Sequence, residues 1–279
     1  MAFVVTLRPA GPPAEWHRYA PGRPAGHCVR LVPVRHDLDM IVRQARRDPA
    51  ARRPWVTRTL IAACCAVFLL GPAAGLDPAY GTGGDLLAAQ TAYFERWGVV
   101  PDELWHSPAA ALLTPLTALF VHGNWLHLLG NMLFLHVFGA MAEERLGRPS
   151  FVLCYLATGH LALLGYAAVH PHSGQALVGA SGAVSGVLGA FLHLFPRARV
   201  TSLFPFLFFL PLRFPAWAVL LFWFALQWPG AGAPDDRPGV AYLAHVLGFA
   251  LGFGFAWVSG RRPVRVKDDA GSTEGDRTT

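Results

Sequence analysis

Apolar residues gather in six stretches that short polar segments separate. The stretches cover about residues 56–76, 124–142, 149–168, 181–194, 215–228 and 240–258, and the very apolar run 204–212 precedes the fifth. A helix needs about 20 residues to cross the hydrocarbon core of a bilayer, and most of the stretches come near that length. The fourth, Ser181 to Leu194, is shorter. The pattern therefore predicts an all-α membrane protein, a bundle of six transmembrane helices with a short central fourth helix.

Polar and proline residues mark the ends of several stretches. Asn124 is a plausible N-cap for the second, the charged run Glu143-Glu144-Arg145 is expected to stop it, and Pro149 opens the third. About 35 mixed residues, 77–111, separate the first two stretches. We expect them to form a long external loop.

Composition and charge agree with a polytopic membrane protein. Of the 279 residues 53% are hydrophobic and 14% are charged, against about 25% charged in an average soluble protein. The predicted external loops hold only Arg96 and Arg237, so 23 − 2 = 21 basic residues lie on or near the other side. By the positive-inside rule both termini are expected to be cytoplasmic, with the chain in the cell membrane. The four cysteines form no C-x-x-C spacing and suggest no disulfide framework.

The chain divides into three predicted parts. Residues 1–54 form an arginine-rich cytoplasmic extension, residues 55–260 the six-span domain, and residues 261–279 a basic and polar cytoplasmic tail.

Three of the predicted spans bring polar side chains to the same depth. Ser181 and His245 each lie 13 residues from the inner end of their span, and Asn131 lies seven residues from the outer end of its own. At about 1.5 Å per residue, all three are about 10 Å below the outer surface. His127 is one turn above Asn131 on the same helix face. Intramembrane polar residues are costly, and we therefore treat these four as candidates for function.

Rows of small residues flank the serine and the histidine. Such rows let two helix backbones pack closely. The row on the sixth span contains Ala244, Gly248, Gly252 and Ala256, and the row on the fourth contains Gly182 and Gly186. We therefore expect these two spans to lie in contact, with Ser181 and His245 hydrogen bonded.

A paired serine and histidine are suited to nucleophilic catalysis. His245 would accept the proton of Ser181 and later return it to the leaving amine. The fourth and sixth spans contain no acidic residue, which predicts a dyad with no carboxylate. The backbone N–H of Ser181 and the side chains of Asn131 and His127 would stabilise the oxyanion.

The motifs resemble those of the rhomboid intramembrane serine proteases. The matching strings are HGNWLHLLGN, with His122, His127 and Asn131; GASG, with Gly179 and Ser181; and AHVLGFALG, with His245. The weaker strings FGAMAEERLG and FPRARV also match, and the resemblance covers about residues 55–260.

The resemblance implies a rhomboid-like six-helix core, a Ser181–His245 dyad, and an oxyanion site that includes Asn131, His127 and Gly179. It also implies cleavage of transmembrane segments of other proteins within the lipid bilayer. In the family pattern His122 is a structural residue near the site. No cofactor, metal or nucleic-acid partner is implied.

The chain departs from the family pattern at two positions. Several relatives have an aromatic residue four positions after the nucleophile, where this chain has Ser185. The Trp-Arg pair found in the first loop of some members is absent, and Trp105-His106 is the nearest string.

Other functions fit the sequence less well. A metalloprotease lacks support because the chain has no H-E-x-x-H motif, although it has 12 histidines. A rhomboid-like protein that binds helices without cutting them would lack the dyad, which this chain retains. A transporter is disfavoured because no paired ionisable residues or inverted repeats are visible.

Overall fold

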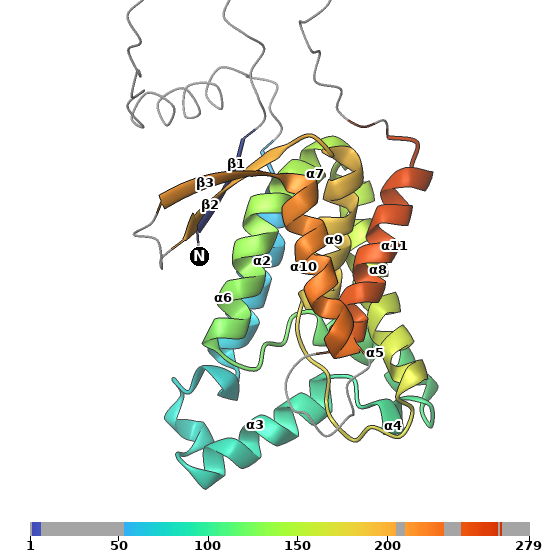
Figure 1. Ribbon diagram of the computed structural model, residues 1–279. Helices are drawn as coiled ribbons and strands as arrows, with labels where there is room; N and C mark the ends of the chain where they lie inside the picture. The colour runs from blue at the N-terminus through green and yellow to red at the C-terminus, as the bar shows by residue number, and fades with distance from the viewer. Residues whose placement is uncertain (1, 7–52, 205–209, 232–240, 262, 264–279) are drawn as a thin grey trace, which may run out of the picture.

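The computed structural model describes residues 2–6, 53–204, 210–231, 241–261 and 263, and these residues are mostly helical (Figure 1). The predicted helical character is thus confirmed. The α-helices are α2 (Trp55–Leu70), α3 (Gly84–Trp97), α4 (Pro101–Leu104), α5 (Pro108–Ala118), α6 (Trp125–Phe134), α7 (Ala140–Leu146), α8 (Arg148–Val169), α9 (Ser181–Leu194), α10 (Ala216–Ala231) and α11 (Tyr242–Val258). Two short 3-10 helices, η2 (Pro72–Ala74) and η3 (Pro78–Tyr80), follow α2. A π-helical segment, η4 (Leu135–Gly139), joins α6 to α7.

Helix α9 is the centre of the bundle. Eleven of its 14 residues are buried, and it contacts α6, α7, α8, α10 and α11. Glycine, alanine and serine occupy many of its buried positions, so neighbouring helices can approach on several sides. The predicted bounds of this short central helix, Ser181 to Leu194, are confirmed.

Helices α9 and α11 meet backbone to backbone. A Cβ atom placed on Gly248 would overlap the carbonyl oxygen of Gly182, and one placed on Gly252 would overlap that of Gly186. The two rows of small residues thus lie against each other, as the sequence predicts.

Helices α3 and α4 lie at one end of the bundle, and α7 lies at the other (Figure 1). Helices α3 and α4, together with η3 and the start of α5, occupy most of the segment 77–111 that was predicted as a loop. Val99 and Leu177 form an isolated antiparallel β-bridge that ties this segment to the chain before α9. The Leu177 N–H donates to the Val99 carbonyl oxygen at 2.8 Å, and the Val99 N–H donates to that of Leu177 at 3.0 Å. The connection between α8 and α9 is thereby fixed to the end of the bundle that carries α3.

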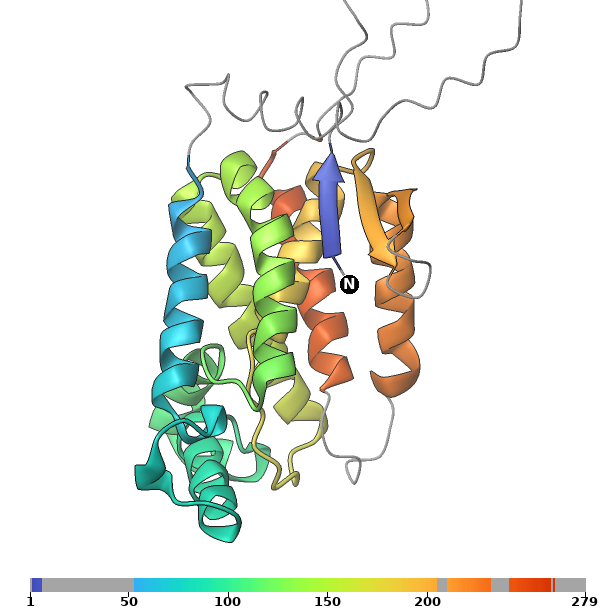
Figure 2. The same ribbon diagram turned by 90° about the vertical axis from the view of Figure 1, so that its left-hand side faces the viewer.

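A three-stranded antiparallel sheet modifies the all-α prediction. Strand β1 (Ala2–Thr6) pairs with β2 (Arg199–Phe204), and β2 pairs with β3 (Leu210–Pro215). The sheet stands beside α10 at the end of the bundle away from α3 (Figures 1 and 2). The apolar run 204–212, expected to lead into the fifth span, instead contributes to this hairpin at its described residues. Strand β3 takes this conformation because it pairs with β2, where Leu212 lies opposite Ser202 and Leu210 lies opposite Phe204.

Two helix ends differ from the sequence prediction. Helix α2 ends at Leu70 and not near Leu76, because Gly71 is extended and Pro72 begins a separate 3-10 turn. The second span continues through Glu143 to Leu146, where Gly147 adopts a left-handed φ of 81°. The charged run does not stop this helix, because Glu143 is buried with hydrogen-bond donors and does not reach solvent.

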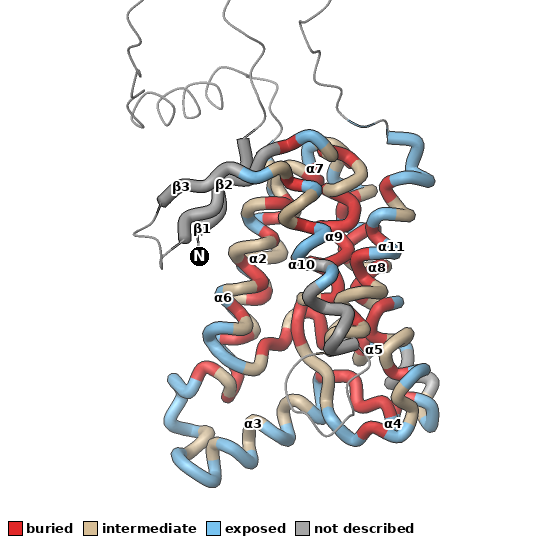
Figure 3. The backbone as a smooth tube through the Cα atoms, in the orientation of Figure 1, coloured by how far each residue is buried: buried red, intermediate tan, exposed pale blue. Residues whose placement is uncertain are grey.

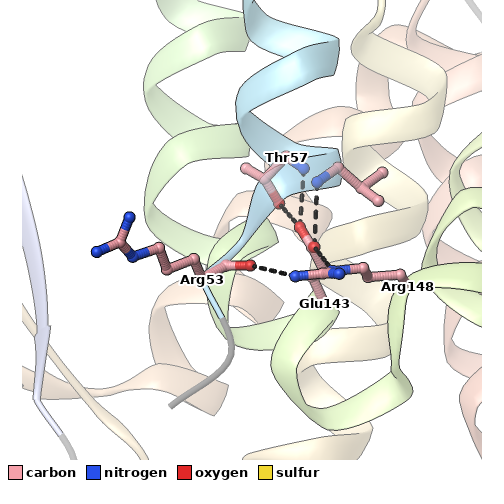
Figure 4. A network of polar contacts seen from close by, with 5 residues as sticks. Arg53, Thr57, Glu143 and Arg148 are labelled. Carbon is pink, nitrogen blue, oxygen red and sulfur yellow. Dashed lines mark hydrogen bonds and ion pairs between the residues drawn. The ribbon is translucent and has the colours of Figure 1, made fainter. Parts of the chain in front are cut away.

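Glu143 joins α7 to the start of α2 (Figure 4). Its side chain is 3% exposed. It accepts hydrogen bonds from the backbone N–H groups of Val56 and Thr57 at 3.1 and 2.8 Å, and from Thr57 Oγ1 at 2.8 Å. Arg148 Nε lies 3.9 Å from the same carboxylate. Since the first N–H groups of a helix have no partner within it, Glu143 acts as the N-terminal cap of α2 from another helix.

The outer surface of the bundle is apolar. Two continuous helical segments of 22 residues, Trp125–Leu146 and Arg148–Val169, have the length and hydropathy needed to cross a membrane, and α2, α9 and α11 are shorter apolar helices. Figure 3 shows buried positions where the helices meet and exposed positions facing outward. Large exposed apolar side chains include Leu126, Leu129, Leu153, Leu161, Leu221, Phe222, Trp257 and Val258. A surface of this kind is suited to contact with lipid.

Candidate active site

A cavity of about 830 Å³ opens between the starts of α6, α9 and α11 and the end of the bundle that carries α3. Ser181, His245, His127, Gly179 and Gly182 all line it. The residues predicted to share one depth on three helices therefore face one space, with the exception of Asn131.

Ser181 is the first residue of α9. No side chain caps the start of this helix, so the N–H groups of its first turn have no side-chain acceptor among the described residues and lie beside the serine. Gly179, two residues earlier, has a φ of 126°. Its N–H donates to the carbonyl oxygen of Ala118 at 2.9 Å, which fixes the turn that leads into the helix.

The imidazole of His127 lies against Gly179. A Cβ atom at position 179 would be 2.6 Å from both Cε1 and Nε2 of His127. The backbone N–H of Gly123 donates to His127 Nδ1 at 3.4 Å. Because Nδ1 accepts a hydrogen bond, the proton of the neutral ring is on Nε2. His127 therefore presents an N–H donor to the region between Gly179 and Ser181.

Asn124 and Asn131 hold the main chain around His127. The side chain of Asn124 accepts a hydrogen bond from the His127 N–H at 2.8 Å, which confirms it as the N-cap of α6. Asn131 is 7% exposed, and its Nδ2 donates to the His127 carbonyl at 3.0 Å. Asn131 does not line the cavity, and one of its two amide hydrogens is already used.

His122 lies behind His127. It is 1% exposed, its Nδ1 donates to the Phe120 carbonyl oxygen at 3.3 Å, and the two imidazole centroids are 5.2 Å apart. Its Nε2 has no hydrogen-bond partner among the described residues. Burial, with a smaller effect from nearby His127, lowers the pKa of His122 to about 4, so the ring is neutral near pH 7 and contacts another imidazole without repulsion.

His245 reaches the cavity from α11, next to the small residues that contact α9. The aromatic ring of Tyr242, one turn earlier, lies nearly perpendicular to its imidazole at a centroid distance of 6.3 Å. Ser185 occupies the position at which several rhomboids have an aromatic residue. It is buried and donates to the carbonyl oxygen of Ser181 at 2.6 Å. The aromatic neighbour of His245 thus comes from its own helix.

The remaining predicted glycines support the site indirectly. Gly186, Gly248 and Gly252 do not line the cavity, and they set the contact of α9 with its neighbours instead. A Cβ on Gly186 would also overlap Thr158 of α8.

Several lining residues could not be selected from sequence. Thr91, Phe94 and Glu95 face the cavity from α3, and Gln175, Ala176, Leu177 and Val178 face it from the chain before α9. The spacing of Thr91, Phe94 and Glu95 is that of one helix face, which is the signal that could have grouped them. The loop residues carry no such signal, because the Val99–Leu177 pair that places them joins distant parts of the chain.

The other histidines lie elsewhere. His136, His160, His170, His172 and His193 are not among the residues that line this cavity. Across the described part of the chain no three His, Cys, Asp or Glu side chains gather as metal ligands would.

The fold and the site define a class of protein: an apolar helical bundle with a cavity that is lined by a serine at a helix N-terminus and by two histidines. Comparison with known proteins gives the family. The chain matches the Rhomboid domain over residues 109–262, more than half its length, and it belongs to the rhomboid family, whose members are generally intramembrane serine proteases. The chain is therefore an integral membrane protein, and the resemblance found in the sequence is confirmed.

Curated relatives share part of this region. The chain is 34% identical over 147 residues to "Rhomboid protein 1, mitochondrial" of Saccharomyces cerevisiae, covering 50% of this chain and 39% of that protein. It is 40% identical over 95 residues to "Rhomboid-like protein 11, chloroplastic" of Arabidopsis thaliana, covering 34% of this chain and 33% of that protein. The chain thus spans less than half the length of these relatives.

Proposed function

We propose that this protein is a serine endopeptidase that cleaves transmembrane segments of other proteins through a Ser181–His245 dyad. The observation that carries the proposal is that Ser181, at the start of α9, and His245, on α11, line one cavity. Membership of the rhomboid family supports the same reaction.

In the proposed mechanism His245 removes the proton from Ser181 as the hydroxyl attacks the scissile carbonyl. The tetrahedral intermediate collapses to an acyl-enzyme, and His245 gives its proton to the leaving amine. Water then attacks the ester with His245 again as base, and Ser181 regains its proton. No acidic side chain lines the cavity near these two residues on α9 or α11 in the described part of the chain.

The oxyanion would be stabilised at the N-terminus of α9. The uncapped N–H groups of the first turn supply donors and a positive helix-dipole end. His127 Nε2–H, beside Gly179, supplies another. Asn131 has a second amide hydrogen and fixes the His127 carbonyl with its first, so we assign it a supporting role in the same oxyanion site.

The chain before α9 offers a backbone edge to a substrate. Leu177 uses both its N–H and its C=O in the pair with Val99. In an extended chain, the residues on either side direct their own N–H and C=O groups to the opposite edge. Here these residues are Ala176 and Val178, and both line the cavity. An unwound substrate segment could therefore add as a strand at this edge. A transmembrane helix must open for its carbonyls to reach Ser181, which favours substrates with helix-breaking Gly or Pro.

The proposed topology has six spans, formed by α2, α6 to α7, α8, α9, α10 and α11, with both termini cytoplasmic. The described basic residues support it. Arg96 lies at the end that carries α3, whereas the others lie toward the opposite end: Arg53, Arg58, Arg145, Arg148, Arg197, Arg199, Arg213 and Arg261. By the positive-inside rule the α3 end is external. We further propose the cell membrane as the location and single-span membrane proteins as substrates.

A cleavage assay in liposomes tests the proposal. The full-length protein is reconstituted with a single-span reporter that has Gly and Pro in the outer part of its helix, and products are identified by mass spectrometry. We expect cleavage by the wild type, in the presence and absence of a metal chelator, and none by Ser181→Ala or His245→Ala with unchanged thermal unfolding. Wild-type rates in Ser181→Ala would exclude the mechanism.

A further inference from the structure

The wall of the cavity carries one carboxylate. Among the described residues that line it, Glu95 of α3 is the acidic one, and no lysine or arginine is present. Most of its neighbours on the wall are apolar or uncharged, among them Phe94, Leu126, Tyr166 and Leu177.

Glu95 has no counter-charge in the described part of the structure. No ion pair to it is formed by any described basic side chain. The adjacent Arg96 does not turn back toward it, because its guanidinium lies over the ring of Trp97, 5.5 Å from the centroid. Glu95 is exposed and lines the cavity, so a molecule that enters the cavity can reach its side chain.

The position of α3 places this charge at the mouth of the site. Ser181 and His245 lie on α9 and α11 within the bundle, whereas α3 lies at the end of the bundle (Figure 1). Thr91, Phe94 and Glu95 line the same cavity as Ser181, so a substrate chain that left the cavity at this end would pass that face of α3.

We propose that Glu95 is a specificity-determining residue that favours substrates with an arginine or lysine just outside the membrane, on the external flank of the cleaved bond. This inference rests on the proposed protease function and adds to it the charge of the substrate. A basic side chain entering the cavity meets the carboxylate between low-dielectric walls, where the field of a single charge is focused.

The expected effect is moderate, because Glu95 keeps contact with water. We expect a preference of about threefold to tenfold in kcat/KM, or about 0.6–1.4 kcal/mol, which lies between the upper values for exposed charge pairs and the values for closer interfacial pairs. Basic residues at the external end of a span are uncommon under the positive-inside rule, so such a preference would select a limited group of membrane proteins.

An arginine scan of the reporter tests the inference. One residue at a time on the external flank of the cleaved bond is changed to Arg, Gln or Glu, and kcat/KM is measured in liposomes at low and high salt. We expect one or two positions at which Arg is cleaved about threefold to tenfold faster than Gln, with Glu slower still.

Variants of the enzyme assign the preference to position 95. Glu95→Gln should remove the preference for Arg, and Glu95→Lys should reverse it in favour of Glu. Glu103→Lys is the matched control, since Glu103 is exposed on α4 of the same external segment and does not line the cavity, and it should keep the wild-type preference.

The outcomes separate this inference from the proposed function. Ser181-dependent cleavage with no charge preference, or a preference that Glu95→Lys leaves unchanged, would overturn the role of Glu95 alone. Absence of Ser181-dependent cleavage of every reporter would overturn the protease function and this inference with it.

Discussion

Gly252 of α11 lies directly against the carbonyl group of Gly186 of α9, and no side chain fits between them. One helix turn nearer the cavity, Gly248 lies against Gly182 in the same way. These contacts set the separation of the two helices that carry Ser181 and His245, so the geometry of the candidate dyad depends on positions that have no side chain.

Gly252→Ala is therefore expected to push the two helices apart. The added methyl overlaps backbone atoms that cannot rotate away, and we expect a loss of about 1–3 kcal/mol in the free energy of unfolding, although alanine is the better helix former. Gly254→Ala is the control on the same helix, because a Cβ there meets nothing within 4 Å. Unfolding in detergent should show a destabilised Gly252→Ala and an unchanged or slightly stabilised Gly254→Ala. Equal stability of the two variants would show that α11 can shift without cost.

Glu143→Ala should release the start of α2. The substitution leaves three donors, from Val56 and Thr57, without the carboxylate that accepts from them. We expect a loss of about 2–4 kcal/mol in the free energy of unfolding, since buried donors are left unsatisfied. Glu144→Ala, the exposed neighbour, should change it by less than about 0.5 kcal/mol. A Glu143→Ala variant as stable as Glu144→Ala would show that the cap contributes nothing.

Because His122 is buried, we expect the free energy of unfolding to fall at acidic pH. Its pKa in the folded protein is about 4, below the value of about 6.5 in an unfolded chain. Between these two values the unfolded state binds a proton that the folded state does not. His122 thus contributes its full stability above about pH 6.5 and loses it as pH falls toward 4, at up to about 1.4 kcal/mol per pH unit.

The His122→Asn variant cannot take up this proton. Its stability should fall less steeply than that of the wild type between pH 6.5 and pH 4, whatever its stability at neutral pH. The measurement is the unfolding free energy of both proteins across this pH range. Parallel curves for the two would contradict a buried neutral His122.

Gly179→Ala should disable the site with little effect elsewhere. Its φ of 126° is a conformation that residues with a side chain rarely adopt, and the new methyl would meet the His127 ring at 2.6 Å. We expect cleavage to fall by about 10²-fold or more, because the oxyanion donors around Ser181 shift. Gly174→Ala in the same connection, with open space around its Cβ, should cleave at the wild-type rate. Near-normal activity of Gly179→Ala would argue against this oxyanion geometry.

The sequence predicted the features that depend on local pattern and composition. The apolar segments, the bounds of α9, the Asn124 cap and the rows of small residues follow from hydropathy, residue size and capping preference. The contact of α9 with α11 could be predicted because rows of small residues at four-residue spacing let two helix backbones pack closely.

Features set by distant contacts could not be predicted in this way. The sequence pattern predicts a helix end at Glu143, because it is the first residue of a charged run. The hydrogen-bond donors on α2 that allow Glu143 to be buried are more than 80 residues away and give no local signal. The sheet needs strand β1, near the N-terminus, to pair with β2 almost 200 residues later. The cavity wall contributed by Glu95 and Gln175 depends on how α3 and the α8–α9 connection pack. The sequence predicts Asn131 one turn from His127 on the same helix, but it does not predict the hydrogen bond from Asn131 Nδ2 to the His127 carbonyl oxygen.

The most direct test of the central proposal is labelling of the detergent-solubilised protein with a fluorophosphonate probe, which reacts with activated serines. We expect the wild type to be labelled on Ser181, and both Ser181→Ala and His245→Ala to lose the label while remaining folded. A folded wild type that takes no label, or a His245→Ala variant labelled as fast as the wild type, would contradict activation of Ser181 by His245.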